Sequence, residues 1–240
     1  MIKNIISYDR VSDVFELLNQ NKVNYAILRN YDNLLDDNIY MDGHGDIDLI
    51  CEDSAVFAEV IKAYPQEFHV KNGKPDGSHY YTYVKNNYVS LDLRHIGDGY
   101  YCKKWEKEML ERKVLHNGFY VLNEEDYFYT LIYHAIYQKP LLSAAYRNRI
   151  TEMAKNLNLD YADSASSDFI SLLEIYMKNN NYRYQYPKDK YVPFKKKNIQ
   201  DNSLLDFHFK EYFKNMVLHF KIAVIEFLVK TKHFLLNLKD

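Results

Sequence analysis

Apolar residues in the first half of the chain switch between the spacing of a helix and the spacing of a strand. Residues 8–20 carry apolar side chains every three or four positions, which predicts a helix. Short or alternating apolar runs predict strands, and Asp53 or Ser54 can cap a further helix. The predicted elements are, in order, a helix at 8–20, a strand at 23–28, a strand ending near Cys51, a helix after Asp53, and a hairpin of 80–85 and 88–94 around Asn86-Asn87. This order predicts a small mixed β-sheet with helices on one face.

The pattern changes at Asn123, where helical spacing takes over. Asn123 can cap a helix whose first turn is acidic, Glu124-Glu125-Asp126, and acidic residues are favourable at the positive end of a helix dipole. Helices are predicted over 124–139, 143–157 and 164–179. We therefore expect an α+β fold in two parts, with a sheet domain over residues 1–122 and a helical domain over residues 123–240.

The helical half also contains a segment rich in aromatic and basic residues. Aromatic and polar residues alternate from Tyr182 to Pro187, and lysines are frequent just after them. Such a segment can stack on nucleotides, RNA or sugar rings. Alternatively, it is an aromatic edge of the core followed by a solvated basic loop.

The tail from Ser203 to Asp240 is predicted to be helical, with apolar residues around most of its circumference and lysines spaced through it. A helix of this kind packs on the second domain, is shared in a homodimer, or lies on an anionic membrane surface. Packing inside the protein or in a dimer is the preferred interpretation. Peripheral contact with the inner face of the membrane is the alternative.

Composition limits the class of protein further. The chain has 240 residues, 47% of them hydrophobic, and its net charge of −2 gives no general attraction to nucleic acid, which is not an expected partner. Its two cysteines make neither a disulfide framework nor a metal-ligand cluster. The sequence lacks the apolar stretch of a secretory signal, and no run reaches the ~18 apolar residues of a membrane-spanning helix. A cytoplasmic location is expected.

The candidate chemistry begins with the segment Gly43-His44-Gly45-Asp46-Ile47-Asp48-Leu49-Ile50, which reads as a glycine turn running into a strand. Side chains alternate along a strand, so Ile47 and Leu49 share one face while Asp46 and Asp48 share the other. Two carboxylates this close repel each other, and a bound Mg²⁺ ion removes that cost with the oxygen ligands it prefers. A strand end with two solvated aspartates is the simpler interpretation.

A third carboxylate favours the metal interpretation. In Tyr88-Val89-Ser90-Leu91-Asp92-Leu93-Arg94, the apolar residues form one strand face, while Ser90, Asp92 and Arg94 form the other. If this strand lies beside the first one, Asp92 comes level with Asp46 and Asp48.

An Asp-x-Asp strand, followed about forty residues later by an apolar-Asp-apolar strand, resembles the nucleotidyltransferase superfamily, whose best-known member is DNA polymerase beta. The resemblance covers roughly residues 20–100. It implies a nucleotidyltransferase-like sheet in which Asp46 and Asp48 bind Mg²⁺ (or Mn²⁺). It also implies that Asp92 completes the metal site and helps to activate the attacking hydroxyl.

The chain departs from that family where the triphosphate would bind. Most members carry a Gly-Ser pair on a helix before the Asp-x-Asp motif, and this chain has Leu28-Arg29-Asn30-Tyr31 at the end of the preceding strand instead. Arg29 is a candidate phosphate contact, because a guanidinium group matches phosphate oxygens, or it forms a salt bridge with loop aspartates. The other candidate nucleotide-binding residues are His44, Gly45 and Arg94.

Two more interpretations concern Arg94 and the helix at 124–139. Arg94 either neutralises the carboxylates of the empty site or contacts pyrophosphate. His134 lies off the apolar stripe of its helix, so His134 and Lys139 either face the cleft and meet a substrate phosphate or belong to a packing or solvated face.

These features together lead us to expect a metal-dependent enzyme. The expected reaction moves a nucleoside monophosphate from a nucleoside triphosphate to a hydroxyl or phosphate of a small molecule or surface-glycan precursor, with release of pyrophosphate. One alternative is a phosphotransferase that uses a CDP-activated donor on a glycan. Another is a non-catalytic or toxin–antitoxin-type module with the same fold.

Overall fold

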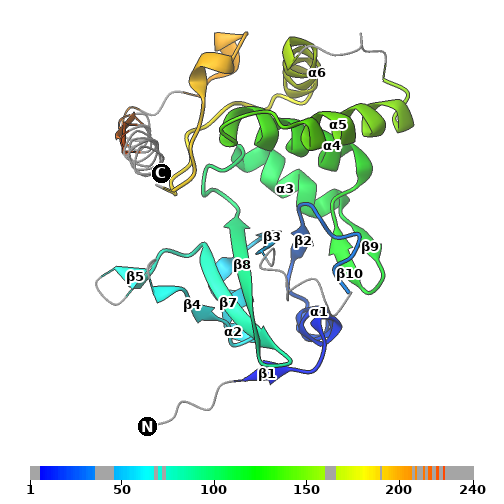
Figure 1. Ribbon diagram of the computed structural model, residues 1–240, viewed down its shortest axis with the longest axis vertical. Coiled ribbons are helices and arrows are strands. Elements are labelled where there is room, and N and C mark those ends of the chain that lie inside the picture. The colour runs from blue at the N-terminus through cyan, green and yellow to red at the C-terminus, as the bar shows by residue number, and fades with distance from the viewer. Residues whose placement is uncertain are drawn as a thin grey trace, which may run out of the picture.

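The computed structural model describes residues 6–35, 46–67, 70–71, 74–159, 166–189 and 191–206, and the single positions 209, 213, 216, 217, 220, 221 and 224. Figure 1 shows a sheet half below and a helical half above. The fold is α+β, as predicted, and its main sheet is mixed. In the described part of the chain, no helix combines the length and hydropathy needed to cross a membrane.

The main sheet has eight strands in the described residues, in the order β1-β7-β8-β3-β2-β10-β9, with β4 beside β7. Its strands are β1 (Ser7–Tyr8), β2 (Tyr25–Ile27), β3 (Asp46–Cys51), β4 (Tyr64–Pro65), β7 (His79–Val84), β8 (Asn87–His95), β9 (Val114–His116) and β10 (Phe119–Val121). A separate small hairpin joins β5 (Val70–Lys71) to β6 (Lys74–Pro75). The sheet is thus larger than the small one predicted.

The helices are α1 (Val11–Gln20), α2 (Ser54–Val60), α3 (Lys103–Arg112), α4 (Glu124–Tyr133), α5 (Ala144–Asn156) and α6 (Ser166–Asn179). A π-helical turn, η2 (His134–Gln138), continues α4, and short 3-10 turns occupy Lys196–Asn198 and Asn202–Leu204. The two predicted caps are confirmed. Asp53 accepts hydrogen bonds from the backbone N–H groups of Ala55 and Val56, and Asn123 accepts one from that of Asp126.

The central strands β3 and β8 are parallel, and β8 returns from β7 through a tight hairpin. The hairpin was predicted, but its turn is Lys85-Asn86 rather than Asn86-Asn87. Both turn residues have positive φ, 49° and 63°, which matches the right-handed twist of the flanking strands. This turn sets the register of the whole β7–β8 pair.

Helices cover both faces of the sheet, whereas the sequence predicted them on one. Ile47 and Leu49 of β3 pack in a buried cluster with residues of α1 and α2. Ile50 belongs to a second cluster on the other face, with Trp105 of α3 and Phe128 of α4. Alternation along β3 explains the division, because Ile50 shares its face with Asp46 and Asp48. The second cluster continues across the boundary predicted at residue 122.

Asp126 ties three helices together inside this second cluster. It is fully buried at the start of α4 and accepts hydrogen bonds from Trp105 Nε1 (3.0 Å), Tyr176 Oη (3.0 Å) and Arg112 Nη2 (2.8 Å). These donors come from α3 and α6. The buried carboxylate therefore fixes how α3, α4 and α6 pack on one another.

We expect Asp126→Ala to lower the free energy of unfolding by about 3 kcal/mol, because buried donors of Trp105 and Tyr176 lose their acceptor and Arg112 loses its buried partner. Urea denaturation followed by circular dichroism measures this change. The matched control is Glu125→Ala, an exposed residue in the same helical turn, which should change stability by less than about 0.5 kcal/mol. Equal effects of the two substitutions would contradict the role given to Asp126.

Candidate functional site

The three predicted aspartates lie on one face of two neighbouring strands. The parallel β3–β8 pairing sets Asp48 against Asp92 and Asp46 against Ser90. Asp46 and Asp48 are two residues apart, so all three carboxylates project from the same side of the sheet. The register sets Asp92 level with Asp48, as expected, whereas Asp46 lies two positions back along β3, opposite Ser90.

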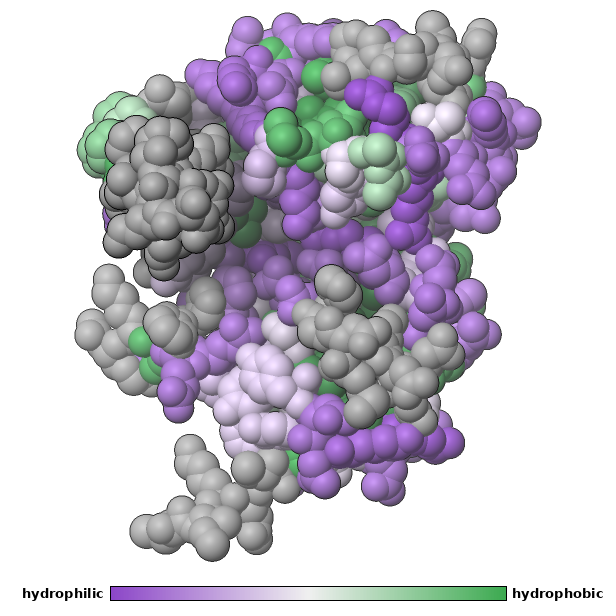
Figure 2. Space-filling model, in the orientation of Figure 1, coloured by the Kyte–Doolittle hydropathy of each residue, from purple (hydrophilic) through white to green (hydrophobic). Residues whose placement is uncertain are grey.

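These aspartates line a cleft of about 530 Å³ between the sheet half and the helical half. Figure 2 shows hydrophilic side chains along the band that separates the two halves. The opposite wall comes from the end of α4 and the turn after it, with His134, Gln138 and Lys139, and from Tyr146 of α5. Of the two interpretations of this helix, the lining agrees with the one in which His134 and Lys139 face the cleft.

Two buried arginines neutralise two of the aspartates. Arg29 donates to both carboxylate oxygens of Asp48, at 2.9 and 2.7 Å, and Arg94 donates to both oxygens of Asp92, each at 2.9 Å. Burial lowers the pKa of each guanidinium, but the facing aspartate raises it above its ordinary value. Arg94 also donates to Asp189 at 2.9 Å. Asp46 is exposed at the mouth of the cleft.

The place of Arg29 follows from the sheet. Strand β2 runs antiparallel to β3 with Ile27 opposite Leu49, and the Leu28 N–H donates to the Asp48 carbonyl at 2.9 Å. The chain therefore leaves β2 beside Asp48. The sequence offered the loop aspartates as the salt-bridge partners of Arg29, whereas the structure pairs it with Asp48.

A hydrogen-bond chain links this pair to the helical wall. Arg29 donates to Tyr100 Oη at 3.1 Å, Tyr100 Oη lies 3.2 Å from His134 Nδ1, and His134 Nδ1 lies 3.0 Å from Gln138 Oε1. Burial, aided by the charge of Arg29, lowers the pKa of His134 well below its ordinary value, so this imidazole is neutral. Gln138 Nε2 is buried and has no hydrogen-bond partner among the described residues. His134 and Gln138 thus present neutral polar groups to the cleft, and Lys139 on the same wall presents a cation.

The wall itself has an uncommon backbone. Helix α4 ends in the π-helical turn from His134 to Gln138. Single π-helical turns are rare in proteins as a whole, but those that occur are often found at functional sites. Here the turn sets His134 and Gln138 within hydrogen-bonding distance while both line the cleft.

His79 belongs to the site, although the sequence did not single it out. It lies directly across the β7–β8 pair from Asp92, with its Nε2 3.4 Å from Asp92 Oδ1 and its Nδ1 2.6 Å from Asp76 Oδ2. Burial lowers the pKa of His79, but Asp76 and Asp92 raise it above its ordinary value. The position of the hairpin turn could have identified His79. A turn at Lys85-Asn86 sets His79 opposite Asp92, whereas the expected turn at Asn86-Asn87 shifts the register and moves His79 away from Asp92.

The donor chemistry of the aspartates fits a hard divalent cation, because three carboxylates share one face. Among the described residues, however, no three carboxylate, imidazole or thiolate groups lie close enough together to hold one ion. The oxygens of Asp48 and Asp92 bind arginines instead. A magnesium ion therefore fits this face only if Arg29 and Arg94 give up part of these contacts.

Two of the predicted nucleotide-binding residues, His44 and Gly45, lie outside the described residues. The aromatic side chains of Tyr182, Tyr184 and Tyr186 are buried in the second core cluster, so they are structural and do not present a stacking surface. Their alternation in sequence did not separate the two interpretations, because a buried strand-like edge and an exposed one have the same period.

A row of tyrosines extends the aspartate face beyond the cleft. Tyr81 of β7 stacks on Tyr88 of β8 and on Tyr64 of β4, with ring centroids 4.8 and 5.4 Å apart, and Tyr83 packs edge-on against Tyr81. Tyr81 shares its face of β7 with His79. Neutral aromatic rings with hydroxyl groups therefore lie beside the candidate site.

Comparison with models of known protein families gives no match to this chain, and comparison with curated protein sequences gives no relative. The geometry of the cleft is therefore the basis for assigning a function.

The loop that carries Tyr100 is held by a buried glutamate. Glu106 of α3 accepts hydrogen bonds from the Gly97 N–H at 2.6 Å and the Tyr101 N–H at 3.2 Å. Burial and the nearby charge of Asp98 raise the pKa of Glu106 to about 9. Glu106 is therefore protonated at neutral pH in the folded protein.

We expect this proton to make stability depend on pH. Because the pKa of Glu106 is raised on folding, its contribution to stability is full below its ordinary pKa near 4.5 and is lost as the pH rises through about 9. Glu106→Gln should flatten the fall in melting temperature between neutral and alkaline pH, whereas the exposed Glu111→Gln on the same helix should leave it unchanged. A parallel pH profile for Glu106→Gln and the unsubstituted protein, measured by scanning calorimetry, would count against a protonated Glu106.

Proposed function

We propose that the protein is a magnesium-dependent nucleotidyltransferase that moves a nucleoside monophosphate from a nucleoside triphosphate to an acceptor hydroxyl or phosphate. The observation that carries this proposal is the β3–β8 register, which aligns Asp48 with Asp92 and leaves Asp46 on the same face of the cleft. In the proposed reaction the acceptor oxygen attacks the α-phosphorus and forms a new P–O bond. The bond from the α-phosphorus to the α,β-bridging oxygen breaks, pyrophosphate leaves with its electrons, and the proton of a hydroxyl acceptor passes to solvent.

In this proposal Asp46, Asp48 and Asp92 hold the magnesium. When bound, it neutralises phosphate charge and lowers the pKa of the acceptor hydroxyl. If Asp48 or Asp92 turns to the cation, it releases Arg29 or Arg94 respectively. Arg94 keeps its contact with Asp189, whereas the buried Arg29 requires a new anionic partner. Arg29 and Arg94 would then bind phosphate oxygens, with the paired hydrogen bonds that guanidinium groups favour.

Arg29 thus takes the place of the Gly-Ser pair that most nucleotidyltransferases use for the triphosphate. It already spans Asp48 and Tyr100 in the floor of the cleft. Lys139, which lines the opposite wall, adds positive charge where a phosphate chain would pass. In this proposal the charged side chains of Arg29 and Lys139 therefore bind the triphosphate in place of the Gly-Ser pair.

For the acceptor we propose a small molecule or a surface-glycan precursor with free hydroxyl or phosphate groups. Tyr64, Tyr81, Tyr83 and Tyr88 adjoin the aspartate face, and such rings pack well against the apolar faces of sugars. His134 and Gln138 can form hydrogen bonds with a hydroxyl group from the other wall.

If the aspartates turn to Mg²⁺ while the arginines turn to phosphate, Mg²⁺ and the nucleotide should bind cooperatively. A nucleoside triphosphate with Mg²⁺ should raise the melting temperature by more than the sum of the shifts with either one alone, because each ligand compensates the charges released by the other. Differential scanning fluorimetry with each of the four nucleotides measures this effect. Asp46→Asn should abolish the saturable shift, whereas Asp9→Asn, an exposed aspartate outside the cleft, should preserve it.

Other results would select a different function. A saturable shift with a CDP-linked donor, but with no nucleoside triphosphate, would replace the proposal by the CDP-dependent phosphotransferase. No shift with either class of ligand would favour a non-catalytic module.

We further expect Asp92→Asn to reduce pyrophosphate release by about 100-fold or more, because the substitution removes a carboxylate from the proposed metal site. The fold should survive, since Arg94 keeps its hydrogen bond to Asp189. Far-ultraviolet circular dichroism checks the fold, and Asp9→Asn serves as the matched control. Full turnover by a correctly folded Asp92→Asn protein would remove Asp92 from the mechanism.

A further inference from the structure

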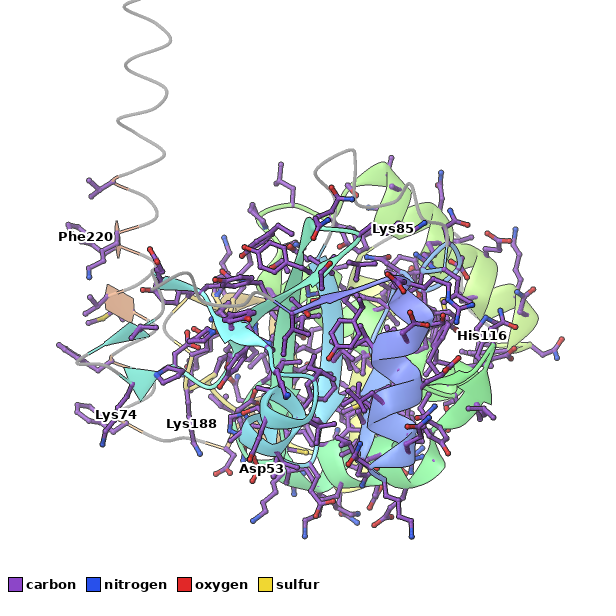
Figure 3. All side chains as sticks on the ribbon, turned by 90° about the horizontal axis from the view of Figure 1, so that it is seen from below. Asp53, Lys74, Lys85, His116, Lys188 and Phe220 are labelled. Atoms are coloured by element: carbon purple, nitrogen blue, oxygen red, sulfur yellow. The ribbon has the colours of Figure 1, made fainter. Side chains whose placement is uncertain are left out.

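Six large apolar side chains near the C-terminus are exposed to solvent. Phe220 is 71% exposed and Phe213 is 52% exposed, values far from those of core residues. The set comprises Phe209, Phe213, Met216, Val217, Phe220 and Val224. Figure 3 shows the labelled Phe220 at the margin of the molecule, with its ring directed away from the body.

These residues recur at helical intervals along the sequence. The six positions are helical and are separated by four, three, one, three and four residues, which is the spacing of a single helical face. We name them the C-terminal stripe. Several exposed large apolar side chains at such spacing on a folded protein mark an interaction site.

Charge identifies the partner. The segment 207–240 contains six lysines and three acidic residues, whereas the whole chain has a net charge of −2, so the rest of the chain is acidic. Lys221, which is exposed, directly follows Phe220 in the sequence. Lys74, on the β5–β6 hairpin, lies on the same side of the molecule as Phe220 (Figure 3). The apolar face is therefore accompanied by cations.

We propose that the C-terminal stripe docks on an anionic membrane surface. Amphipathic helices that combine phenylalanines with lysines lie in the membrane interface, with their apolar residues among the acyl chains and their lysines at the anionic headgroups. Two copies of this segment would place like charges against each other, which disfavours self-association.

The test is sedimentation of the full-length protein with vesicles of phosphatidylcholine alone or phosphatidylcholine mixed with phosphatidylglycerol. We expect binding to the mixed vesicles, weakening as salt is added, and little binding to the neutral ones. The double substitution Phe213→Glu and Phe220→Glu should lower the partition coefficient by roughly tenfold or more, because both charges enter the apolar layer. Leu141→Glu, at an exposed leucine outside the stripe, should bind like the unsubstituted protein.

Circular dichroism should be unchanged in both variants, since every substituted side chain is exposed. Equal binding to the two kinds of vesicle, or binding that the double substitution does not reduce, overturns the proposal. A dimer in light scattering that the double substitution dissociates, without vesicle binding, assigns the stripe to a second copy instead. None of these measurements uses enzymatic activity, so the outcome is independent of the proposed reaction.

Discussion

Negative charge on two adjacent strands is the constraint on which this structure depends. Asp48 and Asp92 are direct neighbours across the β3–β8 pair, and like charges in that position destabilise a sheet. The protein offsets this repulsion with two buried guanidinium groups: Arg29 binds Asp48 through two nitrogens, and Arg94 binds both oxygens of Asp92 through Nη2 alone. Each arginine in turn needs its carboxylate, because an uncompensated buried charge is costly. The four groups therefore stabilise one another.

The helical half supplies what the sheet alone lacks. Asp189, which follows the buried tyrosines of the 182–186 segment, is the second partner of Arg94. Tyr100, on the loop held by Glu106, carries the hydrogen-bond chain from Arg29 to His134. The second core cluster, which runs from β2 and β3 through α3, α4 and α6, holds these groups in place. The cleft thus lies where the two halves share a core.

This arrangement has a consequence for ligands. A cleft whose charges are paired internally has little net attraction for a simple cation or a simple anion. A ligand that brings both signs, such as a nucleotide with its magnesium, can replace both members of a pair at once. The proposed nucleotidyl transfer uses this property, and the row of tyrosines beside Asp46 and Asp92 suits a neutral, hydroxyl-rich acceptor.

Local patterns in the sequence determined the elements and the shared face of the first two aspartates. Alternation within one strand is set by backbone geometry, so Asp46 and Asp48 had to project together, and the caps at Asp53 and Asn123 depend only on residues a few positions away. Tertiary structure decided which groups neutralise the aspartates. The pairing of Arg29 with Asp48, the approach of Asp189 to Arg94 and the position of His79 opposite Asp92 depend on strand order and register, and a shift of one residue in register turns side chains to the other face. The helices on both faces, and the burial of Tyr182, Tyr184 and Tyr186, were likewise decided by packing between segments far apart in the chain, which the period of a single segment does not contain.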